Sequence, residues 1–111
     1  MCDAIELIRD IDDWCQGAGE RISNGVVQFC AEGALTVATL ATTVDMCANT
    51  QRARQFNRLR IAVQNEIHEQ GYYHASLPHF NDRQTPGRQQ VHEEVIQVME
   101  KTAAKLAEAG E

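Results

Sequence analysis

The stretch that most constrains the fold of this chain is residues 29–41, FCAEGALTVATLA. It carries a single charged residue, Glu32, and it is rich in glycine and alanine. A helix that is apolar on nearly every side is usually buried among other elements, and small side chains let neighbouring helices come close. The stretch therefore predicts the central helix of a compact fold. Exposure of Ala34 and Ala38 to water would contradict this prediction.

Two amphipathic helices are predicted on either side of the central one, because their apolar residues recur at spacings of three and four. The first covers residues 3–16, with Asp3 as its N-cap and Gly17 as its stop. The second runs from about residue 50 to residue 70, with Asn49 or Thr50 as its cap. Residues 42–48 fit either an extension of the central helix or a bend.

The last amphipathic helix has the clearest signals. Thr85 is predicted to cap it, Pro86 to occupy its first position, and Gly110 to end it. Its acids gather early and its lysines late, which matches the helix dipole. The sequence therefore predicts a mainly α fold: a compact bundle of about four helices around a central small-residue helix, with one short β-hairpin.

The hairpin is predicted near residues 20–29. Asn24-Gly25 stands between β-prone residues and favours a tight two-residue turn, in which both positions need positive φ. Such a turn places Ile22 opposite Val27, and we expect that apolar face to cover the core. Residues 1–111 are interpreted as a single helical domain, since a chain of this length can bury a sizeable core.

Charge and targeting signals narrow the classes of function. The net charge of −6 weighs against nonspecific nucleic-acid binding. No signal peptide is visible, and the central stretch is too short for a membrane span, so we expect a cytoplasmic protein without membrane contact. We expect no cofactor and no metal site, because the four cysteines, Cys2, Cys15, Cys30 and Cys47, lack the close spacing of zinc ligands. Buried, reduced cysteines are the alternative that we favour.

Charged faces on two helices are candidate surfaces for binding a protein partner. Glu6, Asp10 and Asp13 share the polar face of the first helix and could dock a basic partner. Arg54 and Arg58 should be exposed on the helix that follows residue 50, where no acid lies among the arginines. For both faces, a solvated surface or internal ion pairing is the alternative.

A polar segment near residues 71–84 is the candidate site for a small ligand. Its tyrosines, histidines, asparagine and aspartate supply donors, acceptors and a group that titrates near neutral pH. The alternative is local capping and packing. The candidate ligand-binding residues are Tyr72, Tyr73, His74, His79, Asn81 and Asp82.

Three short motifs resemble those of a family of small uncharacterised proteins found in actinobacteria and their phages. They are Trp14-Cys15-Gln16-Gly17, Cys30-Ala31-Glu32-Gly33-Ala34 and Phe80-Asn81-Asp82. The resemblance implies a shared fold and no known activity; Phe80 departs from the tryptophan expected there. We expect structural roles for Trp14, Cys15, Cys30 and Phe80. We expect the three motifs to meet, with Trp14 against Phe80 and with Asp82 paired to Arg52 or Arg60.

Three functions are consistent with these observations, and no catalytic motif is recognisable. The first is a noncatalytic protein-interaction or accessory factor of bacterial or phage origin, with homo-oligomerisation left open. The second is a small-ligand-binding protein or minor enzyme that uses residues 72–82. The third is a nucleic-acid-binding regulator acting through Arg54 and Arg58. Whether the protein is an enzyme is left uncertain, with a noncatalytic role preferred.

Overall fold

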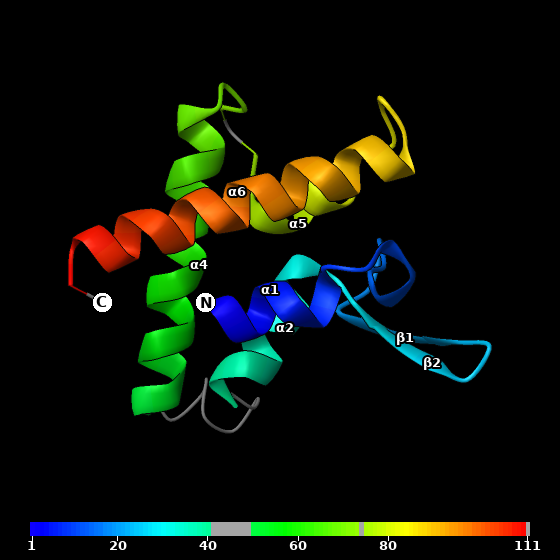
Figure 1. Ribbon diagram of the computed structural model, residues 1–111, viewed down its shortest axis with the longest axis horizontal. Helices are drawn as coiled ribbons and strands as arrows, with labels where there is room; N and C mark the ends of the chain where they lie inside the picture. The colour runs from blue at the N-terminus through cyan, green and yellow to red at the C-terminus, as the bar shows by residue number, and fades with distance from the viewer. Residues whose placement is uncertain (41–49, 74, 111) are drawn as a thin grey trace.

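In the computed structural model, the helices pack against one another and a β-hairpin projects beyond them (Figure 1). The structure describes residues 1–40, 50–73 and 75–110. The elements are α1 (Cys2–Ile8), the 3-10 helix η1 (Ile11–Asp13), β1 (Glu20–Ser23), β2 (Val26–Phe29), α2 (Ala31–Thr39), α4 (Gln51–Glu69), α5 (Leu77–Asn81) and α6 (Arg88–Glu108). The prediction of a mainly α fold with a minor β component is confirmed.

Helix α2 is the central helix, and it packs against α1, α4 and α5. It begins later than predicted because Phe29 is the last residue of β2, and the Cys30 side chain caps the helix. Ala34 is fully buried, and Ala38 packs partly buried against the core. The small-residue stretch therefore occupies the predicted central position. The choice left open for residues 42–48 lies outside the described residues.

The packing around Gly33 shows why α2 needs a residue without a side chain at this position. A Cβ atom built on Gly33 would lie 2.0 Å from the backbone oxygen of Gly19. Real Cβ atoms do not approach another atom so closely, and a backbone carbonyl cannot move aside as a side chain can. Glycine at position 33 thus permits the loop before β1 to lie directly on α2.

The predicted helix over residues 3–16 is wrong in its length. Helix α1 begins after Met1 rather than at Asp3 and ends at Ile8, and η1 follows separately. Between them the Asp10 carboxylate accepts a hydrogen bond from the backbone N–H of Asp12 at 2.9 Å. An aspartate that bonds its own local backbone competes with helix continuation, which accounts for the break.

The two long helices, α4 and α6, cross one another (Figure 1). Thr50, one of the two residues predicted as the cap, caps α4, and its side chain accepts a hydrogen bond from the N–H of Ala53. The predicted start of α6 is wrong, since Gly87 is the N-cap and Pro86 precedes the helix. Gly87 has a φ of 150°, which L residues rarely adopt. None of the helices in the described parts of the chain has the length and apolar character needed to span a bilayer.

The hairpin forms as predicted but does not cover the core. Asn24 and Gly25 both have positive φ, and Ile22 pairs with Val27. However, 71% of Ile22 and 43% of Val27 are exposed, because the hairpin extends away from the helices (Figure 1). It is attached at its base, where Phe29 forms a parallel bridge with Trp14.

Candidate functional site

Three segments that are distant in sequence meet at the side chain of Asn81, which is fully buried. Its Oδ1 accepts hydrogen bonds from Trp14 Nε1 at 2.7 Å and from the backbone N–H of Ala31 at 3.0 Å. Its Nδ2 donates to the backbone oxygen of Cys15 at 3.0 Å and to Asp82 Oδ1 at 2.9 Å. The amide uses all of its hydrogen-bonding groups within the protein. We call these contacts the Asn81 junction.

Neighbouring contacts extend the junction on one side. Gln16 Nε2 donates to the backbone oxygens of Asn81 at 3.0 Å and Arg83 at 2.7 Å. Asp82 Oδ1 accepts from the backbone N–H of Gly17 at 2.9 Å. The expected pairing of Asp82 with Arg52 or Arg60 is therefore wrong, because this carboxylate turns toward the junction.

Trp14 is fully buried beneath two residues of α6. Its ring centroid lies 5.3 Å from that of His92 and 5.3 Å from the guanidinium carbon of Arg88. Arg88 also donates to the backbone oxygens of Ile11 and Trp14, both at 2.9 Å. These contacts fix the chain leaving η1 against α6, so that the backbone after Trp14 reaches Asn81 in a defined position.

Phe80 lies on the buried face of α5. The expected contact with Trp14 is wrong, because the aromatic partner of Phe80 is Tyr72. The centroids of Phe80 and Tyr72 are 4.9 Å apart at 75°. The Arg83 guanidinium lies 4.0 Å from the Phe80 centroid and 4.6 Å from that of Tyr72, and it forms an ion pair with Glu94 at 2.8 Å. Stacking and ion pairing together hold α5 against α6.

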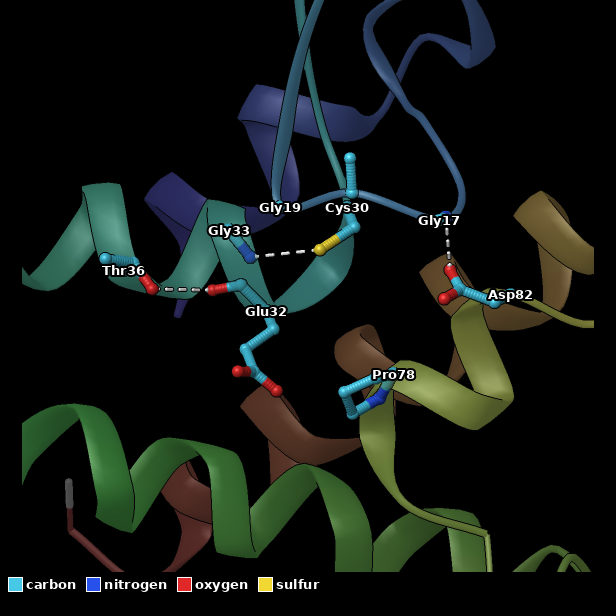
Figure 2. A pocket seen from close by; sticks show the side chains of 9 residues that line it. Gly17, Gly19, Cys30, Glu32, Gly33, Thr36, Pro78 and Asp82 are labelled. Atoms are coloured by element: carbon cyan, nitrogen blue, oxygen red, sulfur yellow. Dashed lines mark hydrogen bonds between the residues drawn. The ribbon is translucent and has the colours of Figure 1, made fainter.

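A pocket of about 290 Å³ lies beside the Asn81 junction (Figure 2). We call it the junction pocket. Asp82, at the end of α5, and Glu32, in the first turn of α2, contribute its two carboxylates. The lining residues are Gly17, Ala18, Gly19, Cys30, Glu32, Gly33, Thr36, Pro78 and Asp82, and they include no cation.

The two acids of the pocket are held differently. Asp82 Oδ1 is fixed by Gly17 and Asn81. The Glu32 side chain extends from α2 toward the side of the pocket formed by Pro78 (Figure 2). The Thr36 hydroxyl bonds the Glu32 backbone oxygen at 3.0 Å and leaves the carboxylate to face the pocket. The Asp82 carboxylate is therefore held by two hydrogen bonds, whereas the Glu32 carboxylate points toward the pocket.

Cys30, which lines the pocket, and Cys15, which does not, are both poor nucleophiles. Burial raises the pKa of the Cys30 thiol, although the hydrogen bond that Sγ accepts from the Gly33 N–H at 3.3 Å acts in the other direction. Burial also raises the pKa of the Cys15 thiol, and the neighbouring Cys30 adds to this effect. Both thiols therefore stay neutral near pH 7. The described residues contain no cluster of three or more histidine, cysteine or acidic side chains able to hold a metal ion.

Residues of the predicted polar segment lie in different environments. The side chain of Tyr72 is partly buried, whereas 72% of Tyr73 is exposed and His79 is exposed on α5. His74 lies outside the described residues. Asn81 is committed to the junction, so that Asp82 is the residue of this set that lines the junction pocket.

The predicted acidic face on the first helix is divided by the break after α1. Glu6 is exposed and pairs with Arg9 at 2.8 Å, whereas Asp10 caps η1 and Asp13 lies half-buried within it. A separate hollow of about 540 Å³ beside Glu6 is lined by Asp3, Glu6, Leu7, Val37, Ala38 and Leu40. The structure thus brings Glu6 beside apolar residues of α2, which the sequence spacing did not indicate.

Arg54 and Arg58 are exposed one turn apart on α4, as predicted. With Gln51 and Gln55 they line a hollow of about 320 Å³. This hollow and the junction pocket have no lining residue in common.

No binding or structural role was predicted for three residues of this region, Glu32, Arg83 and Arg88. One signal for Glu32 was present, since it is the single charged residue of residues 29–41. A charge placed in an otherwise apolar helix must face a pocket, a partner or solvent. The roles of Arg83 and Arg88 depend on contacts with residues distant in sequence, and no local pattern indicates them.

Comparison with known proteins gives one match. A family model described as a family of unknown function, DUF6197, matches residues 2–105. No curated protein and no solved structure matches the chain.

Proposed function

The chain belongs to the DUF6197 family of unknown function, and we propose that it is a noncatalytic protein-interaction factor whose partner inserts a basic side chain into the junction pocket. The observation that carries this proposal is the pair of carboxylates, Glu32 and Asp82, which line a pocket without a lining cation. Carboxylates accept hydrogen bonds and do not donate them at neutral pH. The pocket therefore favours a cationic donor.

The size of the pocket supports a single side chain as its occupant. Pockets for drug-sized molecules are usually about 300–1,000 Å³, and the junction pocket, at about 290 Å³, lies just below that range. An arginine guanidinium presents five donors in a planar fork that suits carboxylates. Asp82 is preorganised by its hydrogen bond from Gly17, and the Glu32 carboxylate points toward the pocket.

A noncatalytic role is supported by the chemistry at the pocket. The available nucleophile, the Cys30 thiol, has a raised pKa and already accepts a hydrogen bond from the backbone of its own helix. A reactive cysteine needs the opposite, a lowered pKa. The described lining residues also include no histidine that could act as a base beside it.

The proposal is tested by titrating the labelled protein with N-acetyl-arginine amide and following backbone amide signals by NMR. We expect chemical-shift changes at Gly17, Gly19 and Gly33, and none with the neutral citrulline analogue. Glu32→Gln should weaken binding about fivefold, since a partly exposed charge pair contributes roughly 1 kcal/mol. Glu93→Gln, an exposed acid on α6 outside the pocket, is the matched control. Equal shifts with citrulline would overturn the proposal.

A second candidate function uses the same acids for a free small ligand, as in the alternative of a small-ligand-binding protein or minor enzyme. This alternative is supported by Asp82, which lines the pocket, whereas Tyr72, Tyr73 and His79 do not. A thermal-shift screen against small amines separates the two candidates, because a ligand that binds the native state raises Tm. A large rise in Tm with a free amine, which does not increase when the same group is presented within a peptide, would favour the small ligand.

Nucleic-acid binding through Arg54 and Arg58 remains a third candidate, supported by the hollow that these residues line. The net charge of −6 opposes it. The proposed cytoplasmic location and bacterial or phage origin rest on the sequence alone, as does the role of Glu6, Asp10 and Asp13 in docking a basic partner.

A further inference from the structure

The two outer edges of the hairpin differ in what lies beside them. In the described parts of the chain, β1 and β2 form a two-stranded sheet, so each strand has one outer edge. The edge of β2 is used at its base, where the backbone N–H of Cys15 donates to the oxygen of Phe29 at 3.0 Å. All four residues of β1 are exposed, and the hairpin projects away from the helices (Figure 1). The outer edge of β1 is therefore accessible to a partner.

The register identifies the backbone groups that this edge presents. In an antiparallel pair, hydrogen-bonded residues alternate with residues whose N–H and C=O groups point outward. The backbone N–H of Cys30 donates to the oxygen of Gly19 at 3.2 Å, so Gly19 is a bonded position and Arg21 is the next one. Glu20 and Ile22 therefore point their backbone groups away from β2. No other backbone hydrogen bond of the described residues engages these groups.

The side chains of the hairpin favour a further strand at this edge. Ile22 and Val27 pair across the sheet, and 71% and 43% of their surfaces are exposed. A two-stranded hairpin is only marginally stable in water, whereas a third strand with an apolar face stabilises it. Extended peptides bind open sheet edges by adding such a strand, with main-chain hydrogen bonds giving affinity and side-chain pockets giving specificity.

The open edge leads into the junction pocket. Gly19, which directly precedes β1, lines the pocket, as does Ala18. An added antiparallel strand that passes Ile22 reaches the level of Ala18 four residues later. The two carboxylates of the pocket, Glu32 and Asp82, then lie at the end of the edge, where they complement a basic residue of the added strand.

We propose that the partner docks as an extended strand on the outer edge of β1, antiparallel to it, with an arginine in the junction pocket. The arginine follows by four positions the residue that lies opposite Ile22. This inference rests on the proposed function and adds the conformation of the partner and its second contact. The outward backbone groups of Glu20 and Ile22 supply hydrogen bonds, and a β-branched residue beside Ile22 extends the apolar face.

The test titrates the labelled protein with the peptide acetyl-Val-Thr-Val-Thr-Arg-amide and follows it by NMR. In the proposed register, the first valine lies opposite Ile22 and the second opposite Glu20. We expect chemical-shift changes and slowed hydrogen exchange at both of these amides, together with a shift at Gly19. The peptide should bind at least about tenfold more tightly than N-acetyl-arginine amide, because it adds backbone hydrogen bonds. N-methylation of both valines should abolish this gain.

Two proline variants identify the edge. Ile22→Pro removes an outward N–H but no hydrogen bond between β1 and β2, a position at which proline is tolerated. It should lose the gain in affinity and still bind N-acetyl-arginine amide. Val27→Pro is the matched control, because Val27 lies opposite Ile22 and points its N–H to the other edge. This variant should keep the gain.

The outcomes separate this inference from the function on which it rests. A peptide that bound no more tightly than N-acetyl-arginine amide, with no change at Ile22, would overturn the strand docking and leave the proposed function standing. Full affinity of the N-methylated peptide would also overturn the strand docking. If neither compound shifted the amides of the junction pocket, both proposals would be wrong.

Discussion

Trp14 Nε1 donates a 2.7 Å hydrogen bond to Asn81 Oδ1, and both side chains are fully buried. The two residues lie 67 positions apart in the sequence. The same Asn81 oxygen accepts from the backbone of Ala31 at the start of α2. One amide thus joins the chain after η1, the central helix and the end of α5.

Replacing Asn81 with alanine is expected to lower the free energy of unfolding by at least about 3 kcal/mol. The change leaves the Trp14 indole N–H and the Ala31 N–H buried without their acceptor. Urea denaturation, followed by Trp14 fluorescence, measures the effect. Asn65→Ala, at an exposed position on α4, should change stability by less than about 0.5 kcal/mol. Equal effects of the two substitutions would contradict the assigned role of Asn81.

Gly33→Ala is expected to destabilise the protein by about 1–3 kcal/mol, despite the better helix propensity of alanine. The new methyl group would meet the Gly19 backbone oxygen at 2.0 Å. Gly19→Ala is the matched control, because nothing lies within 4 Å of a Cβ at that position. Thermal unfolding of both variants measures the difference, and a Gly33→Ala protein as stable as Gly19→Ala would disprove the close contact.

Glu66 should make stability depend on pH in the acid range. Its carboxylate is 4% exposed, pairs with Lys105 Nζ at 2.6 Å and accepts from Gln70 at 2.9 Å. Burial acts to raise the pKa of Glu66, but the hydrogen bonds from Lys105 and Gln70 outweigh it and lower the pKa below its ordinary value of 4.5. Because the folded pKa is lowered, the contribution is present above pH 4.5 and is lost as the pH falls through the folded pKa.

Glu66→Gln is therefore expected to show a smaller loss of stability between neutral and acid pH than the wild-type protein. Urea denaturation at about pH 7 and about pH 3.5 measures this difference. Glu93→Gln, which alters an exposed acid on α6, should keep the wild-type pH dependence. If the stability of Glu66→Gln changed with pH as much as that of the wild-type protein, the ion pair between Glu66 and Lys105 would not act in solution.

The exposed face of the hairpin should tolerate polar substitution. Ile22→Thr and Val27→Thr are expected to change the free energy of unfolding by less than about 0.5 kcal/mol each, because both side chains are exposed and lie outside the core. Val95→Thr, at a buried position on α6, should cost considerably more. A marked loss of stability in Ile22→Thr would indicate that the hairpin packs against the helices in solution.

Local signals predicted most of the elements correctly. The Asn24-Gly25 turn follows from the need for positive φ, and Thr50 follows from the preference of helices for a hydroxyl cap. The central position of Ala34 follows from the absence of charge around it. Each of these signals depends on residues that are close in sequence.

The errors have a different physical origin. The start of α6 depends on Gly87, whose conformation a propensity scale does not specify, and Asp10 ended the first helix by bonding its own backbone. Asp82 turned toward Gly17 because Asn81 and Gln16 bring that loop beside it. Contacts across more than 60 residues, such as the one that Gly17 makes, cannot be derived from spacing in one sequence.

The hairpin turn offers a place to attach a probe. Asn24 and Gly25 stand at the exposed tip, and the Trp14–Phe29 bridge closes the chain at the other end of the hairpin. Lengthening an exposed loop whose ends are already fixed costs little conformational entropy. An epitope or a fluorescent protein inserted between Asn24 and Gly25 would therefore report on the intact molecule, and it would leave the Asn81 junction undisturbed.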